Sequence, residues 1–175
     1  MKQTLIAQVE DKPGVLNRIA SLFRRRNFNI ESLTVGHSEI PGVSRMTIVT
    51  DEEEMLRRNV IRRNLLKLIN VIDVQDVTDT PSVIRETALI KVNVDAAQRG
   101  QVMDVAEMYR ARIVDVATET LIIEVTGESS KIEALTEVLN PFGILEMTRT
   151  GQIAMTRGAV VPRNGRAKVS MNGQH

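Results

Sequence analysis

The succession strand, helix, strand, strand, helix, strand occurs twice in this chain, and no other feature of the sequence limits the fold as strongly. The two copies align at an offset of 86 residues, with small residues opposite small ones and apolar residues opposite apolar ones. The aligned pairs are Gly14 and Gly100, Leu16 and Val102, Ile19 and Val105, Ala20 and Ala106, and Phe23 and Tyr109. A repeat of this kind predicts two similar α+β units in one chain.

Hydrophobic periodicity predicts the elements of the first copy. Strands are expected where apolar and polar residues alternate, and helices where apolar residues recur every three or four positions. The predicted strands are 4–10, 28–36, 45–50 and 71–77; one helix follows Gly14 and a second spans 51–68. The residues expected to face the core are Leu16, Ile19, Ala20 and Phe23 on the first helix, and Leu56, Val60, Ile61, Leu65 and Leu68 on the second.

The second copy follows a short polar connection at 78–85. Its predicted strands are 88–94, 113–117, 121–126 and 144–149, and its predicted helices are 101–110 and 129–139, the latter capped by Ser129. Each copy is expected to form a ferredoxin-like βαββαβ unit, with a four-stranded antiparallel sheet and two helices on one face. The predicted domains are 1–79 and 80–158, followed by a flexible tail at 159–175.

Composition excludes several classes of function. Lys and Arg total 23 and Asp and Glu total 22, so nothing draws the whole protein to nucleic acid or to an anionic membrane. The chain has no cysteine, which rules out disulfides and thiolate metal sites and agrees with a cytoplasmic location. No signal peptide and no membrane span are expected, because no apolar run approaches the ~20 residues that cross a bilayer.

The segment from Glu10 to Gly14, EDKPG, joins the first predicted strand to the first predicted helix. The first backbone N–H groups of a helix have no acceptor within it, and the helix dipole adds partial positive charge there. A carboxylate suits such a position, Gly14 leaves room for it, and Asp11 is placed to accept a hydrogen bond from an ammonium group. The pattern fits an amino-acid site, with ordinary turn chemistry as the alternative.

Other residues extend this hypothesis. Asn29 begins the second predicted strand, where its amide can hydrogen-bond a ligand held by a neighbouring loop; a polar residue at the start of a strand is the alternative. Val15, Leu16 and Ile30 offer an aliphatic lining that suits a branched side chain. Such a pocket separates ligands that differ by one methylene by only ~1–3 kcal/mol, so the preferred aliphatic amino acid stays open.

No catalytic residue and no metal site are predicted. The two histidines, His37 and His175, have no metal-ligand partner nearby in the sequence. The acidic run 51–54 is interpreted as a helix start favoured by the dipole. The arginine pairs at 57–58 and 62–63 are interpreted as a solvated helix face or a docking surface for another subunit. No nucleophile lies at a credible spacing from a base, so nothing argues for catalysis within this chain.

Three motifs carry a resemblance to a known family. They are P-G-V-L at 13–16, F-N-I-E-S-L-T-V at 28–35 and S-R-M-T-I-V at 44–49. Together they resemble the N-terminal ACT domain of the small, regulatory subunit of acetohydroxyacid synthase, also called acetolactate synthase. The segments VMDVAEMYRARIVDV and EVTGESSKIEAL are similar to that family's C-terminal domain, and the likeness covers about residues 2–158.

The resemblance implies a site shared between two chains. ACT domains pair side by side into a continuous sheet, and an amino acid binds where the first strand–helix turn of one chain faces the second strand of the other. By matching position, the effector-binding residues are Asp11, Gly14, Val15, Leu16, Asn29 and Ile30. Many members have Asn where this chain has Asp11. An aspartate there cannot donate to the effector's carboxylate and repels it, although it can still hold the ammonium group.

The resemblance also implies partners. The chain is expected to form a homodimer through its ACT domains and to bind a large catalytic subunit. It would activate that subunit and confer feedback inhibition by a branched-chain amino acid, usually valine. Thiamine diphosphate, Mg²⁺ and FAD are expected only in the catalytic partner, and no cofactor in this chain. A free-standing amino-acid sensor is the alternative. An RNA-binding module is less favoured, because the strands TLIAQVE and RMTIVT lack the aromatic residues on which bases stack.

Overall fold

The computed structural model describes residues 2–52 and 54–158 of the chain. These residues form two compact units, one from residues 2–82 together with 156–158, and one from residues 83–155. The segment 159–175, predicted to be a flexible tail, lies outside the described residues. No helix in the described part of the chain combines the length and the apolar character needed to cross a bilayer.

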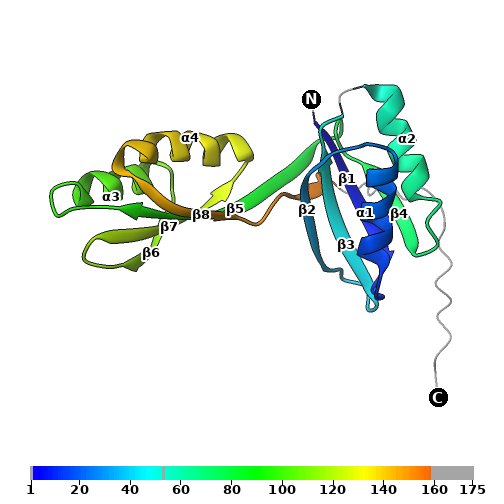
Figure 1. Ribbon diagram of the computed structural model, residues 1–175, viewed down its shortest axis with the longest axis horizontal. Helices are drawn as coiled ribbons and strands as arrows, with labels where there is room; N and C mark the ends of the chain where they lie inside the picture. Colours follow the sequence, from blue (N-terminus) through cyan, green and yellow to red (C-terminus); the bar gives the residue numbers. More distant parts are fainter. Residues whose placement is uncertain (1, 53, 159–175) are drawn as a thin grey trace, which may run out of the picture. The chain divides into compact units, whose positions relative to one another are not determined.

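The first unit follows the predicted order of elements. They are β1 (Gln3–Glu10), α1 (Val15–Arg25), β2 (Ile30–His37), β3 (Val43–Thr50), α2 (Met55–Leu65) and β4 (Val71–Asp76). The strands form an antiparallel sheet in the order β2-β3-β1-β4, so β2 and β4 are its edges. Figure 1 shows α1 and α2 together on one face of this sheet.

Alternation along β1 supplies the centre of the first core. Leu5, Ala7 and Val9 are buried on the face that the helices cover, as the period of two predicts. Leu5 lies opposite Ile48 of β3. The helices complete the cluster with Val15, Ile19, Leu22, Phe23, Ile61 and Leu65. The core is therefore mainly aliphatic, and it fixes how α1 and α2 lie on the sheet.

α1 packs on the sheet through a face that differs from the predicted one. Ile19 and Phe23 are buried as expected. Leu16 and Ala20 are exposed, and Val15 is buried in place of Leu16. The prediction was wrong for these positions because two adjacent apolar residues fit a helical stripe in either of two rotations. Packing against the sheet decides between those rotations.

α2 is shorter than predicted, and two of its apolar residues face outward. It begins at Met55 and ends at Leu65, four residues after and three residues before the predicted limits of 51–68. Ile61 and Leu65 are buried as expected, but Leu56 is 73% exposed and Val60 is 41% exposed. The predicted buried stripe is therefore wrong in the first half of this helix.

An arginine occupies part of the buried face of α2. Arg58 is only 8% exposed and lies on the same side as Ile61 and Leu65. Its Nη2 is 3.1 Å from Asp79 Oδ2, so the buried charge is paired. The position is compatible with burial because the aliphatic stem of arginine packs as an apolar group. Leu68, also predicted to be buried, packs against the core after the helix has ended and is only partly buried.

The second unit repeats the arrangement and confirms the predicted fold of two ferredoxin-like βαββαβ units. Its elements are β5 (Ser82–Asn93), α3 (Arg99–Met108), β6 (Arg112–Val116), β7 (Thr120–Gly127), α4 (Ser129–Leu139), the short 3₁₀ helix η1 (Asn140–Phe142), β8 (Ile144–Arg149) and β9 (Ile153–Thr156). The sheet order is β6-β7-β5-β8, and β9 also pairs with β5. Figure 1 shows α3 and α4 on one face of this sheet, over a second aliphatic core.

The ends of the second unit differ from the predictions. β5 begins at Ser82, inside the segment 78–85 that was expected to be a connection. β9 was not predicted, and just after it the Arg157 N–H donates to the Pro81 carbonyl at 2.8 Å. Short strands such as β9 carry little periodicity of their own, so their pairing is set by the sheet they join.

Ser129 does not cap α4. It is the first residue of the helix, and Glu128 occupies the N-cap position without a side-chain cap. The Ser129 hydroxyl instead accepts a hydrogen bond from Gln152 Nε2 at 2.7 Å. The predicted cap was wrong because the hydroxyl has a partner outside the helix.

Candidate functional site

Gly14 closes the turn between β1 and α1. Its φ of 83° and ψ of −6° lie in the left-handed region, which glycine adopts without strain. A Cβ atom built at this position would have no heavy atom within 4 Å, and no side chain caps the helix. The start of α1 is therefore open to a ligand.

The first amides of α1 are available as donors. The Val15 N–H reaches the Lys12 carbonyl only at the long distance of 3.4 Å. Within the described chain, no group accepts a hydrogen bond from the backbone N–H of Gly14, Leu16 or Asn17. Unpaired N–H groups together with the positive end of the helix dipole favour an anion, so this turn suits a carboxylate.

Hydrogen bonds to two other loops hold the turn in place. The Asp11 N–H donates to the Gly42 carbonyl, in the connection between β2 and β3, at 2.9 Å. The Glu10 N–H donates to the Asn70 carbonyl at 2.9 Å, and Asn70 Nδ2 donates to Glu10 Oε2 at 2.6 Å. Arg18 of α1 donates to Asn70 Oδ1. The donors at the start of α1 are thus fixed relative to β2 and β4.

The pKa of Glu10 tests whether Asn70 holds the turn through its hydrogen bond to the Glu10 carboxylate. The hydrogen bond from Asn70, followed by contributions from Lys12, lowers the pKa of the Glu10 carboxyl. A lowered pKa means that the charged form stabilises the fold at pH values above the ordinary pKa, and that this stabilisation is lost as the pH falls through the lowered value. Asn70→Ala is expected to raise the pKa of Glu10 toward its ordinary value, because it removes the largest cause.

An NMR titration of the Glu10 carboxyl carbon measures this pKa. Asn64→Ala is the control, since Asn64 donates to the Val60 carbonyl within α2 and is not among the causes of the lowered Glu10 pKa. A Glu10 titration that is the same in the Asn70→Ala variant and in the original protein would contradict the assignment.

Asp11 lies beside the end of β2. Its Oδ2 is 3.6 Å from Nδ1 of His37, the last residue of β2, and the two side chains are 50% and 89% exposed. The carboxylate is therefore accessible to an ammonium group, and binding of that group by Asp11 stays a prediction. The same contact shows that the end of β2 lies close to the turn that Gly14 closes.

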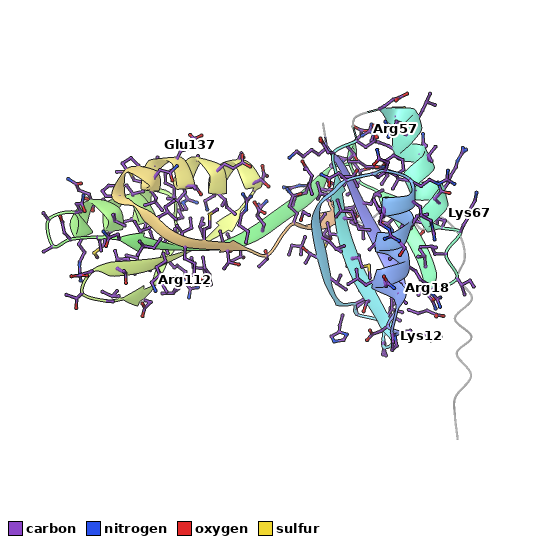
Figure 2. All side chains as sticks on the ribbon, in the orientation of Figure 1. Lys12, Arg18, Arg57, Lys67, Arg112 and Glu137 are labelled. Atoms are coloured by element: carbon purple, nitrogen blue, oxygen red, sulfur yellow. The ribbon has the colours of Figure 1, made fainter. Side chains whose placement is uncertain are left out.

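Asn29 and Ile30 lie at the other end of α1. The helix has 11 residues, so it separates the Gly14 turn from the start of β2 by about 16 Å. Figure 2 shows Lys12, in the turn, and Arg57, near Asn29, at opposite ends of the unit. One chain therefore does not bring all six predicted residues together. It presents them as two separate groups.

The group around Asn29 lines an open hollow of about 290 Å³. Its residues are Asn27, Phe28, Asn29, Thr50, Asp51, Glu52 and Arg57. The Arg57 guanidinium lies 5.2 Å from the centre of the Phe28 ring, and its Nε is 3.0 Å from Glu52 Oε2. The hollow is thus polar, with one cation held over an aromatic face.

Of these residues, the sequence analysis placed only Asn29 in the predicted effector site. Thr50 is brought to the hollow by antiparallel pairing of β2 with β3, in which it lies opposite Ile30. Pairing the two predicted strands as a hairpin would have found it. Arg57 comes from α2 and reaches the hollow only through tertiary packing, so no local signal in the sequence marks it.

The aliphatic residues of the predicted site have different surroundings. Val15 is 4% exposed and packs in the core, so only its N–H faces the turn. Leu16 is 46% exposed beside Gly14. Ile30 is partly buried against the core at the start of β2. Within one chain, the aliphatic surface next to the turn is therefore that of Leu16.

Comparisons with known proteins agree over nearly the whole chain. Residues 5–73 match the family model for an AHAS small subunit-like ACT domain, and residues 85–158 match that for the small subunit of acetolactate synthase. The acetolactate synthase small subunit of Mycolicibacterium smegmatis is 50% identical over 155 residues, covering 89% of this chain and 91% of that relative. The same protein from Mycobacterium leprae gives the same figures.

The crystal structure of the acetolactate synthase small subunit from Thermotoga maritima matches with a TM-score of 0.84 at 38% identity, covering 91% of this chain and 99% of that chain. The resemblance is confirmed, and the chain belongs to the acetolactate synthase small-subunit family with an ACT domain as its first unit.

Proposed function

We propose that two copies of this chain pair through β2 and bind a branched-chain amino acid, with valine as the leading candidate, between the Gly14 turn of one copy and the Asn29 hollow of the other. β2 is an edge of its sheet and none of its residues is buried, so the strand is placed to pair with a second copy. An edge strand presents unpaired N–H and C=O groups that accept a further strand.

The contact between His37 and Asp11 is the observation that carries this proposal. It puts the end of β2 beside the Gly14 turn of the same chain. In an antiparallel pair of β2 strands, the start of one strand lies next to the end of the other. Asn29 and Ile30 of one copy would then approach the turn of the second copy, which would unite the two separate groups.

The chemistry of the joined groups fits an aliphatic amino acid. The unpaired amides at the start of α1 would hold the carboxylate, and the exposed carboxylate of Asp11 would accept hydrogen bonds from the ammonium group. Leu16 from one copy and Ile30 from the other would contact the branched side chain. Neither copy alone supplies all of these contacts, so binding would favour the paired state.

The regulated partner is the large catalytic subunit of acetolactate synthase. Relatives named small subunits support this, since a small subunit implies a larger one. We assign thiamine diphosphate, Mg²⁺ and FAD to that partner, and we place both chains in the cytoplasm. The amino acid would act through its different affinity for two arrangements of the small subunit, with a coupling of ~1–3 kcal/mol.

Reconstitution tests the function. Adding the full chain to the purified large subunit encoded in the same genome is expected to raise the rate of acetolactate formation, and valine is expected to reverse that increase. The rate of the large subunit alone, with and without valine, is the control. No change in rate on addition of the chain would favour the free-standing sensor, which would use the same amino-acid site with a different partner.

A further inference from the structure

The outward side of α2 and the loop after it carry apolar side chains that the described chain leaves uncovered. We call this the α2 surface, and its residues are Met55, Leu56, Val60, Leu66 and Ile69. Leu56 is 73% exposed and Ile69 is 90% exposed. Single exposed apolar residues are common, but several of them on one helix and the loop that follows it are a candidate interaction surface.

The corresponding helix of the second unit gives an internal comparison. α4 holds the same place in the repeat and also buries one apolar stripe, formed by Ile132, Leu135 and Leu139. Its outward side is mainly polar and includes Glu133 and Glu137, while Val138 is its one large apolar residue counted as exposed in the described structure. The repeat therefore does not require an apolar exterior on this helix.

The charged residues within the stretch 55–69, which carries the α2 surface, are all basic. Between residues 55 and 69 the chain has no acidic residue and five basic ones, namely Arg57, Arg58, Arg62, Arg63 and Lys67. Arg57 and Arg58 form ion pairs, and Arg62 donates to the Val74 carbonyl. Arg63 and Lys67 are exposed and form no ion pair with any described residue. Figure 2 shows Lys67 projecting away from the unit. These cations favour a partner with carboxylates.

Charge argues against two other binding partners for the α2 surface, a second copy of it and the segment 159–175. A second α2 surface would bring like charges together, because each copy carries the same basic residues. The segment 159–175 of this chain has three basic residues and no acidic one, so it would be repelled as well. α2 packs against β4, at the opposite edge of the sheet from β2, and would therefore stay open when two copies pair through β2.

We propose that the α2 surface docks the large catalytic subunit of acetolactate synthase, through a patch on that subunit in which apolar side chains are flanked by Asp and Glu. This inference rests on the proposed function, which supplies the partner. The apolar residues would provide the buried centre of the contact, and Arg63 and Lys67 would lie at its rim. An effector bound near Gly14 and Asn29 would then act on the partner through the packing of α1 against α2.

Association between the full chain and the purified large subunit tests the inference, measured by interferometry alongside the rate of acetolactate formation. Leu56→Asp combined with Val60→Asp is expected to weaken association at least about tenfold, while calorimetry still shows valine binding. Val138→Asp on α4 is the matched control and is expected to leave association unchanged. Arg63→Glu combined with Lys67→Glu is a second variant, expected to weaken association most at low salt.

The outcomes separate this inference from the function on which it rests. If the original chain associates and raises the rate, but both double variants do the same with unchanged affinity, the inference is overturned. Weakening by Val138→Asp to the same extent would also overturn it. If the original chain neither associates nor raises the rate, the proposed function fails and the inference fails with it. If the Leu56→Asp and Val60→Asp variant loses valine binding, its weaker association could come from altered structure. The Arg63→Glu and Lys67→Glu variant then decides whether the α2 surface binds the large subunit, because it replaces charged side chains and no apolar ones.

Discussion

Replacing Gly14 with aspartate is expected to abolish detectable valine binding by the isolated protein and to leave its circular dichroism spectrum nearly unchanged. The new carboxylate would lie among the amides that are proposed to hold the carboxylate of the ligand. Two such charges about 4 Å apart repel by about 1 kcal/mol in bulk water and about 4 kcal/mol near a protein surface. The upper value applies to a site enclosed by protein and weakens binding nearly a thousandfold, which takes it below detection. Isothermal titration calorimetry measures the effect.

Two control variants separate charge from backbone strain. Gly14→Ala introduces the strain of a Cβ atom at a φ of 83° but adds no charge, so it is expected to weaken binding less than Gly14→Asp. Gly151→Asp places the same side chain at a φ of 82° in the second unit and is expected to leave valine binding unchanged. Unaltered affinity in Gly14→Asp would mean that the turn has no part in binding.

Leu65→Ala is expected to lower the free energy of unfolding by about 2–5 kcal/mol. Leu65 is 0% exposed in the first core, where its removal leaves a cavity between α2 and the sheet. Urea denaturation followed by circular dichroism measures the change.

Leu56→Ala on the same helix provides the control. Leu56 is 73% exposed, and surface substitutions of this kind change stability by no more than about 0.5 kcal/mol. The sequence alone assigns both leucines to one buried stripe, whereas the structure assigns them to opposite sides of α2. Equal losses of stability in the two variants would contradict that orientation.

Strands were predicted better than the rotation of helices, and the difference has a physical cause. A strand has only two faces, so Leu5, Ala7 and Val9 identify the face that packs against the helices, although Ile6 on the other face is buried as well. A helix with adjacent apolar residues, such as Val15 and Leu16, has more than one acceptable rotation. The buried Arg58 also makes the buried face of α2 hard to predict, because the residue that pairs with its charge in the described structure, Asp79, lies 21 residues away in the sequence.

Only part of the candidate site could be predicted from the sequence. Gly14 was identified because a glycine before a helix has a local meaning, and its positive φ agrees with that reading. Arg57 and Thr50 were missed because α2 and β3 bring them to Asn29 from elsewhere in the chain. The separation of Gly14 from Asn29 along α1 also follows from local structure, since any helix of this length puts its two ends far apart.

The hydrogen bond from Arg157 to Pro81 has a consequence for anyone who wishes to express the ACT domain alone. The chain leaves the first unit at Ser82 and returns to it at Thr156, so the second unit is inserted into the first. A gene stopped after codon 82 would discard the returning segment and leave the Pro81 carbonyl without its donor. Excising the insert and joining its two flanks with a short linker would retain both.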